Sequence, residues 1–328
     1  VQRLRHDLQQ LQFLKRQGVL PSATLQPAID AFSAVYDELD GDRAYADTLA
    51  RFAASTADSD EGRLSLPALS PVRLSGAQLA SLFPYFNRRW FASEAGERLP
   101  GGAKLLNARL DWAALSAQFL SPDRAPAPHV VIDRALSPQG LERMRAYMRR
   151  SAIWNLNRAL GYIGSYLEFG GECPLLAQLA EELAGRLPRV ICFRKLVRAW
   201  SYVYDNELPL GLGAHADAAV ITANLWLTDT DASVERGKGG LVLFHAAADT
   251  LGDSATRASA TGEVAKALRR AKFANTTIAY TGNRLTLFRS NLIHQTHAGR
   301  FRDGYENRRI STSLLFGMGV GEDACDLP

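Results

Sequence analysis

Short segments in which side chains alternate between two faces fill the second half of the chain, and they restrict its fold more than any other feature. Residues 194–204 alternate most clearly, because Tyr202 and Tyr204 share one face of an extended chain while Ser201 and Val203 share the other. Similar segments, with turn signals between them, are 220–228, 240–245, 277–280, 284–288 and 309–316. So many short strands are typical of a β-sandwich or barrel.

Helical patterns precede these strands. One amphipathic stripe follows Ser137-Pro138, and a second covers residues 173–187. Helices followed by many short strands predict an α+β fold, in which a sandwich or barrel is backed by helices.

The first part of the chain is helical in pattern. Residues 4–14 carry leucines at helical spacing, and residues 25–39 and 45–53 continue the pattern, so we expect an antiparallel helical pair. We interpret His6 and Asp7 as surface or helix-contact residues and not as ligands. A proline-rich joint then divides the chain into an N-terminal helical region with a connecting segment, 1–120, and a second domain, 121–328.

Composition excludes several classes of partner. The net charge of +4, from 38 basic and 34 acidic residues, gives no reason to expect nucleic acid. No run of eighteen apolar residues occurs, so we expect no membrane span. The three cysteines lack C-x-x-C spacing, which predicts neither a zinc cluster nor a disulfide framework and favours a reducing, cytoplasmic location. The oligomeric state is not indicated.

His215 and Asp217 form the first part of a candidate metal site. Side chains two apart on an extended strand point to the same face, so the imidazole and the carboxylate project together. A His-x-Asp pair arises often by chance, and a solvated strand-end pair is the alternative, but His294 follows a strand-like run downstream. Two imidazoles and one carboxylate are the ligands that suit non-heme Fe(II) oxygenases. His297 competes with His294, and His245 is most simply structural.

Arg309 opens the last strand-like segment and competes with its neighbour Arg308. Parity favours Arg309, because it shares a face with Ser311, whereas Arg308 shares one with Ile310. Another segment shows polar or amphipathic side chains on one face: Thr222, Asn224 and Trp226. Such a face either meets water or lines a pocket, and periodicity does not distinguish the two.

Together these motifs resemble the Fe(II)- and 2-oxoglutarate-dependent dioxygenases, in particular the prolyl-hydroxylase-like branch. The chain is also similar to the catalytic domain of bacterial proteins that join such a domain to tetratricopeptide repeats. The resemblance covers roughly residues 128–319 and rests on His215-x-Asp217, GGLVLF, NRLTLFRSNLIHQTHAG and GYENRRISTSLLFG. It implies a double-stranded β-helix of the jelly-roll or cupin-like kind, with Fe(II) held by His215, Asp217 and His294.

The resemblance also implies two co-substrates, 2-oxoglutarate and O₂. The family's 2-oxoglutarate anchor is a basic residue at the start of the last core strand, here Arg309, with Ser311 completing an Arg-x-Ser arrangement. A guanidinium can hold a carboxylate through two parallel hydrogen bonds. Tyr204 is a candidate for a further carboxylate contact, followed by Tyr202. Asn224 is expected to line the pocket, and Trp226 is expected to belong to the core or to the pocket wall.

The implied reaction is hydroxylation of an unactivated C–H bond, with release of succinate and CO₂. Asp217 stands where halogenating relatives carry a small residue, which favours hydroxylation. A peptide or protein, an amino acid and another small molecule all remain open as substrates. Residues 246–274 form an insertion with a helix at 262–271, long enough to act as a lid. Two rivals stay open: a cupin-like metalloenzyme without 2-oxoglutarate, and a non-catalytic helical interaction module.

Overall fold

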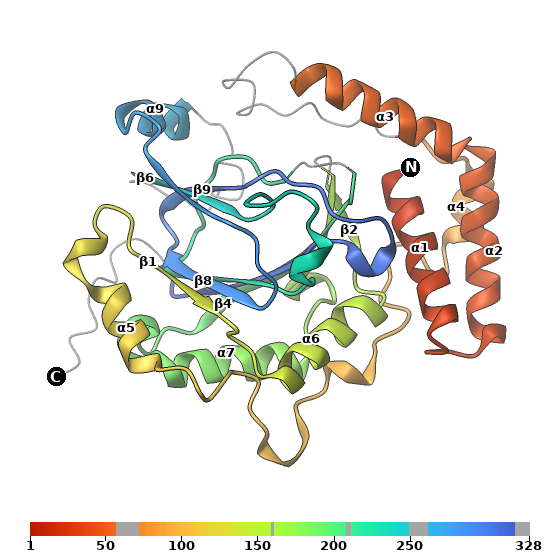
Figure 1. The fold of residues 1–328 in the computed structure, drawn as a ribbon. Helices are drawn as coiled ribbons and strands as arrows, with labels where there is room; N and C mark the ends of the chain where they lie inside the picture. Colours follow the sequence, from red (N-terminus) through yellow and green to blue (C-terminus); the bar gives the residue numbers. More distant parts are fainter. Residues whose placement is uncertain (57–71, 159–160, 208–210, 249–261, 319–328) are drawn as a thin grey trace.

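Four helices form one end of the molecule (Figure 1). The computed structural model describes residues 1–56, 72–158, 161–207, 211–248 and 262–318. The helices are α1 (Gln2–Arg16), α2 (Ser22–Glu38), α3 (Gly41–Thr56) and α4 (Gly76–Leu82). α1 and α2 pack together as predicted, and Gly18 makes the turn after α1 with a φ of +62°, a conformation that glycine adopts without strain.

Two antiparallel sheets make up the rest of the chain with the remaining helices. The larger sheet has seven strands in the order β1-β8-β5-β10-β4-β3-β2, and the smaller has three in the order β7-β6-β9. Their bounds are β1 His129–Asp133, β2 Leu156–Arg158, β3 Tyr162–Tyr166, β4 Leu196–Tyr204, β5 Ile221–Trp226, β6 Leu241–Ala247, β7 Asn275–Ile278, β8 Arg284–Arg289, β9 Leu292–Thr296 and β10 Ile310–Phe316. The predicted α+β class is confirmed as a mixture of helices and antiparallel sheet, while β2 and β3 were not predicted.

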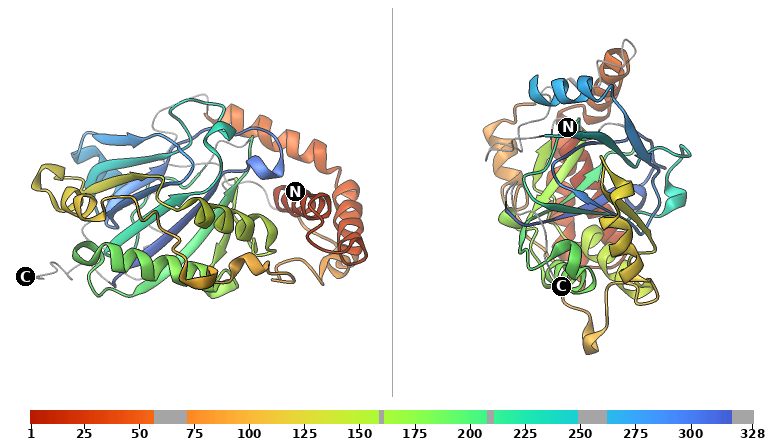
Figure 2. Two further views of the ribbon diagram at one scale, coloured as in Figure 1. Left: turned by 60° about the horizontal axis from the view of Figure 1, so that its bottom comes forward. Right: turned by 90° about the vertical axis from the view of Figure 1, so that its left-hand side faces the viewer.

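Helices cover one face of the larger sheet (Figures 1 and 2). They are α5 (Trp112–Leu120), α6 (Pro138–Arg150), α7 (Pro174–Arg186) and the short α8 (Pro188–Ile191). Met144 of α6 and Leu179 of α7 share one buried cluster with Ala223 of β5 and Leu314 of β10. The apolar side chains of each strand's alternating pattern point into this cluster, so the polar side chains between them point toward the smaller sheet.

The apolar core shows how the N-terminal region joins the sheets. One buried cluster groups α1 and α2 with Tyr305, whereas the larger cluster under the sheet already includes Ala95, Leu99 and Trp112. Packing therefore groups residues 95–120 with the sheets, and the domain division at residue 120 stays a prediction.

The N-terminal His6 and Asp7 are helix-contact residues and not surface residues. His6 is fully buried, its Nδ1 lies 2.9 Å from the Asp7 carboxylate, and its ring packs near Trp154 and Tyr305. Helical spacing placed the two side chains apart, but His6 packs near Trp154 and Tyr305, Asp7 pairs with Arg3 and His6, and both side chains are buried.

The remaining expectations concern the insertion, the cysteines and the membrane. The predicted helix in the insertion is α9 (Gly262–Arg270), which packs on β6, while residues 249–261 lie outside the described residues and the lid stays a prediction. Cys173 is free, but Cys192 is disulfide-bonded, which the cysteine spacing did not predict. Among the described residues, no helix is both long and apolar enough to cross a membrane. The cytoplasmic location stays a prediction.

Candidate functional site

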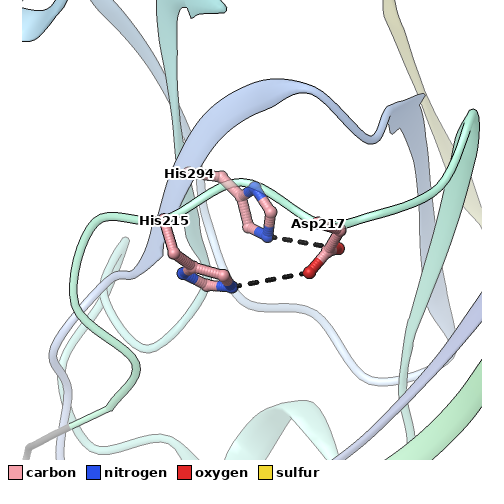
Figure 3. A group of neighbouring side chains, drawn as sticks. All are labelled: His215, Asp217 and His294. Atoms are coloured by element: carbon pink, nitrogen blue, oxygen red, sulfur yellow. Dashed lines mark ion pairs between the residues drawn. The ribbon is translucent and has the colours of Figure 1, made fainter. Parts of the chain in front are cut away.

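His215, Asp217 and His294 come together between the two sheets (Figure 3). The Nε2 atom of His215 lies 3.7 Å from Asp217 Oδ1, and that of His294 lies 3.5 Å from Asp217 Oδ2. One potential ligand atom from each residue lies within 4.8 Å of the others. His215 and Asp217 lie in the segment between β4 and β5, and His294 lies in β9.

Backbone hydrogen bonds bring these distant residues together. The N–H of each histidine donates to the carbonyl of the other, at 3.0 Å and 2.7 Å, and the Asp217 N–H donates to Ser290 O at 2.9 Å. His215 therefore forms an isolated bridge with β9 instead of ending a strand of its own. The predicted common face arises from this pairing.

Each imidazole is oriented by its other nitrogen. His215 Nδ1 lies 2.7 Å from Gly213 O and His294 Nδ1 lies 2.9 Å from Leu292 O. A carbonyl oxygen only accepts, so Nδ1 carries the proton and the Nε2 lone pair faces Asp217. Burial first, and then the neighbouring His215, lower the pKa of His294 to about 4, although Asp217 and the Leu292 carbonyl act in the opposite direction. His294 is thus a neutral imidazole at neutral pH, the form that binds a metal ion.

Two hydroxyls stand behind the carboxylate. Thr222 Oγ1 donates to Asp217 Oδ2 at 2.9 Å and lies 2.8 Å from Ser290 Oγ. The single Thr222 proton points to the carboxylate, so Ser290 donates to Thr222 in turn. All three residues are buried, and this relay fixes the orientation of the carboxylate, as partners of metal ligands commonly do.

Arg309 lies in the same pocket and is almost fully buried. Its Nε donates to Gly239 O at 2.7 Å, its Nη2 approaches Gly240 O at 3.4 Å, and its guanidinium carbon lies 4.2 Å from the centre of the Tyr204 ring. Nη1 is buried and has no hydrogen-bond partner among the described residues. Arg309 lines the pocket, whereas Arg308 points away from it and donates to Gln9.

A single pocket includes all of the predicted ligand and cofactor residues. Its lining contains His215, Asp217, His294, Arg309, Ser311, Tyr204, Tyr202 and Asn224. The lining also contains Trp200, Leu212, Leu241, Phe288 and Thr296, which we did not predict as site residues, and Thr222 and Ser313, for which only the strand parity gave a signal. About 400 Å³ of space lies between these side chains, part of it open to solvent.

Both polar and aromatic side chains line this pocket. Asn224 Nδ2 donates to Ser313 Oγ at 2.8 Å, while its Oδ1 is buried and has no partner in the part of the chain that the structure describes. Tyr202 shares a hydrogen bond of 2.7 Å with Tyr166, and burial raises the pKa of Tyr202 well above its usual value. Trp226, in contrast, is a core residue, fully buried and stacked on Tyr280.

The competing histidines lie outside the group of potential metal ligands. His245 Nε2 lies 2.9 Å from Thr276 Oγ1, the structural role that we expected. The backbone N–H of His297 donates to Gly240 O, and His297 does not line the pocket.

The residues fit a metal ion and an anionic co-ligand. His215, Asp217 and His294 each bring one potential ligand atom to the same place, and each also has an atom that is already hydrogen-bonded to another group. A metal ion bound there would neutralise the charge of the buried Asp217 carboxylate. The unpartnered Nη1 of Arg309 is a buried cationic donor without an acceptor, which an incoming carboxylate would supply.

Comparisons with known proteins found similarity in structure only. No family model matches the chain, and no curated protein matches it. Similar solved structures include HygX from Streptomyces hygroscopicus with nickel and 2-oxoglutarate bound, at 14% identity over 60% of this chain and 85% of that chain, with a TM-score of 0.43. A Pseudomonas putida prolyl-4-hydroxylase is 16% identical over 63% of this chain and 100% of that chain, with a TM-score of 0.40.

A third solved structure is SnoK, a non-heme alpha ketoglutarate dependent carbocyclase. It is 13% identical over 66% of this chain and 87% of that chain, with a TM-score of 0.48. At these identities the similarity concerns the fold alone.

Proposed function

We propose that this chain is an Fe(II)- and 2-oxoglutarate-dependent dioxygenase whose two sheets form a double-stranded β-helix. The overall reaction is R–H + 2-oxoglutarate + O₂ → R–OH + succinate + CO₂, in which 2-oxoglutarate and the substrate together supply the four electrons that reduce O₂. The observation that carries the proposal is the composition of one pocket, which contains two imidazoles and a carboxyl group beside a buried guanidinium whose Nη1 has no acceptor among the described residues.

His215, Asp217 and His294 would hold the iron, which when bound supplies the redox chemistry that activates O₂. A one-carboxylate ligand set leaves one net positive charge on a ferrous site, which favours a dianionic co-substrate in the adjoining positions. The remaining tasks belong to the protein. Thr222 keeps the Asp217 carboxylate in one orientation, and the two backbone carbonyls at Gly213 and Leu292 keep the Nε2 atoms turned inward.

Arg309 would bind the far carboxylate of 2-oxoglutarate. Gly239 O and the Tyr204 ring hold the guanidinium in place before any ligand arrives, so that little side-chain freedom is lost on binding. Ser311, Tyr204, Tyr202 and Asn224 are the further polar groups that would orient 2-oxoglutarate or the substrate.

The pocket wall also bears on the substrate. Trp200, Leu212 and Phe288 line it, and they would exclude water from the reacting C–H bond. A peptide, an amino acid or another small molecule with an apolar group could present such a bond.

The test is an anaerobic titration of the iron-loaded protein with 2-oxoglutarate, followed by the weak visible charge-transfer band of the chelate. We expect Arg309→Met to weaken 2-oxoglutarate binding on the order of a hundredfold, because a buried charge-assisted pair is lost, and to leave metal binding unchanged. Arg284→Met is the matched control, since Arg284 bonds Asp133 and does not line the pocket.

The rivals predict different outcomes of the same titration. A metalloenzyme without a co-substrate binds metal but gives no band with 2-oxoglutarate, and a non-catalytic module gives neither. A screen for substrate-stimulated succinate release then identifies what is oxidised.

A further inference from the structure

Two dipeptides meet where β4 ends and β10 begins. Tyr204-Asp205 and Arg308-Arg309 are joined by a hydrogen bond of 2.9 Å from Tyr204 N–H to Arg309 O. Tyr204 and Arg309 line the pocket, with the guanidinium over the ring. Asp205 and Arg308 contact each other outside the pocket, and they are 3% and 1% exposed.

Arg308 connects this junction to the N-terminal helix α1. Its Nη1 lies 3.4 Å from both Tyr204 O and Asp205 Oδ2, so the side chain joins the two strands. Its Nε and Nη2 donate to Gln9 Oε1 at 3.1 Å and 2.8 Å. Gln9 belongs to α1 and therefore supplies an acceptor for two of the Arg308 donors.

The N-terminal helices hold the partner carboxylate too. Arg5 of α1 lies 3.6 Å from Asp205 Oδ2, and the Tyr45 hydroxyl of α3 donates to Asp205 Oδ1. Burial alone would raise the pKa of Asp205, but Arg308, Tyr45 and Arg5 keep it below its usual value. Asp205 is therefore ionised at neutral pH and pairs with Arg308.

We propose that Gln9, acting through Arg308, is a positioning residue for Arg309, and that the N-terminal helical region is part of the 2-oxoglutarate-binding apparatus. The inference rests on the proposed function, since it takes Arg309 as the carboxylate anchor. Arg308 and Arg309 share a peptide unit, so the bonds that fix Arg308 limit the rotation of the backbone that carries Arg309. A change of about 1 Å in the position of such a group can lower its effectiveness a hundredfold.

Gln9→Met tests the inference, because methionine has a similar length and no acceptor oxygen of comparable strength. Gln10→Met is the matched control: Gln10 also ties α1 to the rest of the molecule, through Ser151 O at 2.9 Å, but touches neither arginine. Gln9→Glu retains acceptor oxygens for Arg308. The full-length proteins are titrated with Ni(II), and the Ni(II)-loaded proteins are then titrated with 2-oxoglutarate.

We expect Gln9→Met to raise the Kd for 2-oxoglutarate on the order of tenfold, the equivalent of one hydrogen bond to a charged group. The Kd for Ni(II) stays the same in every variant, and Gln10→Met and Gln9→Glu bind 2-oxoglutarate as the wild type does. A purely structural role would instead change thermal stability in Gln9→Met and Gln10→Met and leave both binding constants alone.

The two proposals fail in different ways. If wild-type protein and Arg309→Met bind 2-oxoglutarate equally, or neither binds it, the proposed function is overturned and this inference with it. If only Arg309→Met loses binding, while Gln9→Met binds as the wild type or no worse than Gln10→Met, this inference alone is overturned.

Discussion

Replacing Thr222 by valine would test whether the site is built to hold a metal ion. Thr222 is fully buried and its hydroxyl donates to Asp217 Oδ2 at 2.9 Å, so valine removes this donor while keeping nearly the same shape. A hydrogen bond to a charged group contributes about 1.5–3 kcal/mol. Without this hydrogen bond the Asp217 carboxylate rotates more freely between His215 and His294. Metal binding must then also fix the orientation of the carboxylate, which lowers the metal affinity.

The expected loss of metal affinity is about 10- to 100-fold, the range observed when partners of metal ligands are removed. This corresponds to about 1.4–2.8 kcal/mol, which agrees with the strength of one such hydrogen bond. Isothermal titration of the apoprotein with Ni(II) or Mn(II) at a fixed neutral pH measures the change without interference from iron oxidation.

Thr286→Val is the matched control for this experiment. Thr286 lies on β8, is equally buried, and its hydroxyl has no hydrogen-bond partner among the described residues. Its removal therefore leaves metal affinity unchanged and the protein as stable as before, or slightly more so. Equal metal affinity in Thr222→Val and the wild type would refute the view that the hydroxyl relay prepares Asp217 for a metal ion.

Two further substitutions test how the fold supports the site. His6 is buried with a pKa of about 4, lowered chiefly by burial, whereas an unfolded histidine titrates near 6.5. The unfolded state therefore binds more protons than the folded state between these pH values, so the free energy of unfolding falls as the pH drops through this window. From pH 7 to pH 5 the free energy of unfolding, measured by denaturant titration, should fall by about 2 kcal/mol more in the wild type than in His6→Asn. Equal decreases in the two proteins would contradict the lowered pKa of His6. Gly240→Ala would place a methyl carbon 1.9 Å from Ile278 O, so we expect a stability loss of about 1–3 kcal/mol and weaker 2-oxoglutarate binding, because Gly240 O and Gly239 O receive the Arg309 guanidinium. A thermal melt measures the change in stability, and the 2-oxoglutarate titration measures the change in binding. An unchanged melting temperature would show that the backbone at Gly240 can move away from Ile278 O without loss of stability.

Much of the site follows from local sequence patterns. The preference for Arg309 over Arg308, the face that Arg309 shares with Ser311, and the polar face that carries Asn224 each depend only on the two-residue repeat within one extended segment, and the pocket contains all three residues. The strand β2 was missed because it spans only Leu156–Arg158, too short for alternation to be visible. The strand β3 was missed because its residues are buried on both faces, so exposed and buried positions do not alternate.

Sequence alone determined which residues have the chemistry for a metal and carboxylate site, and which side of each strand they occupy, because both properties depend on the residue and its immediate neighbours. Tertiary structure decided which of these sides meet. The mutual backbone pairing of His215 and His294 closes the metal site, and the contact of Gln9 with Arg308 spans almost the entire chain. Neither contact has a local signal, because hydrogen bonds between distant segments depend on how the whole chain packs.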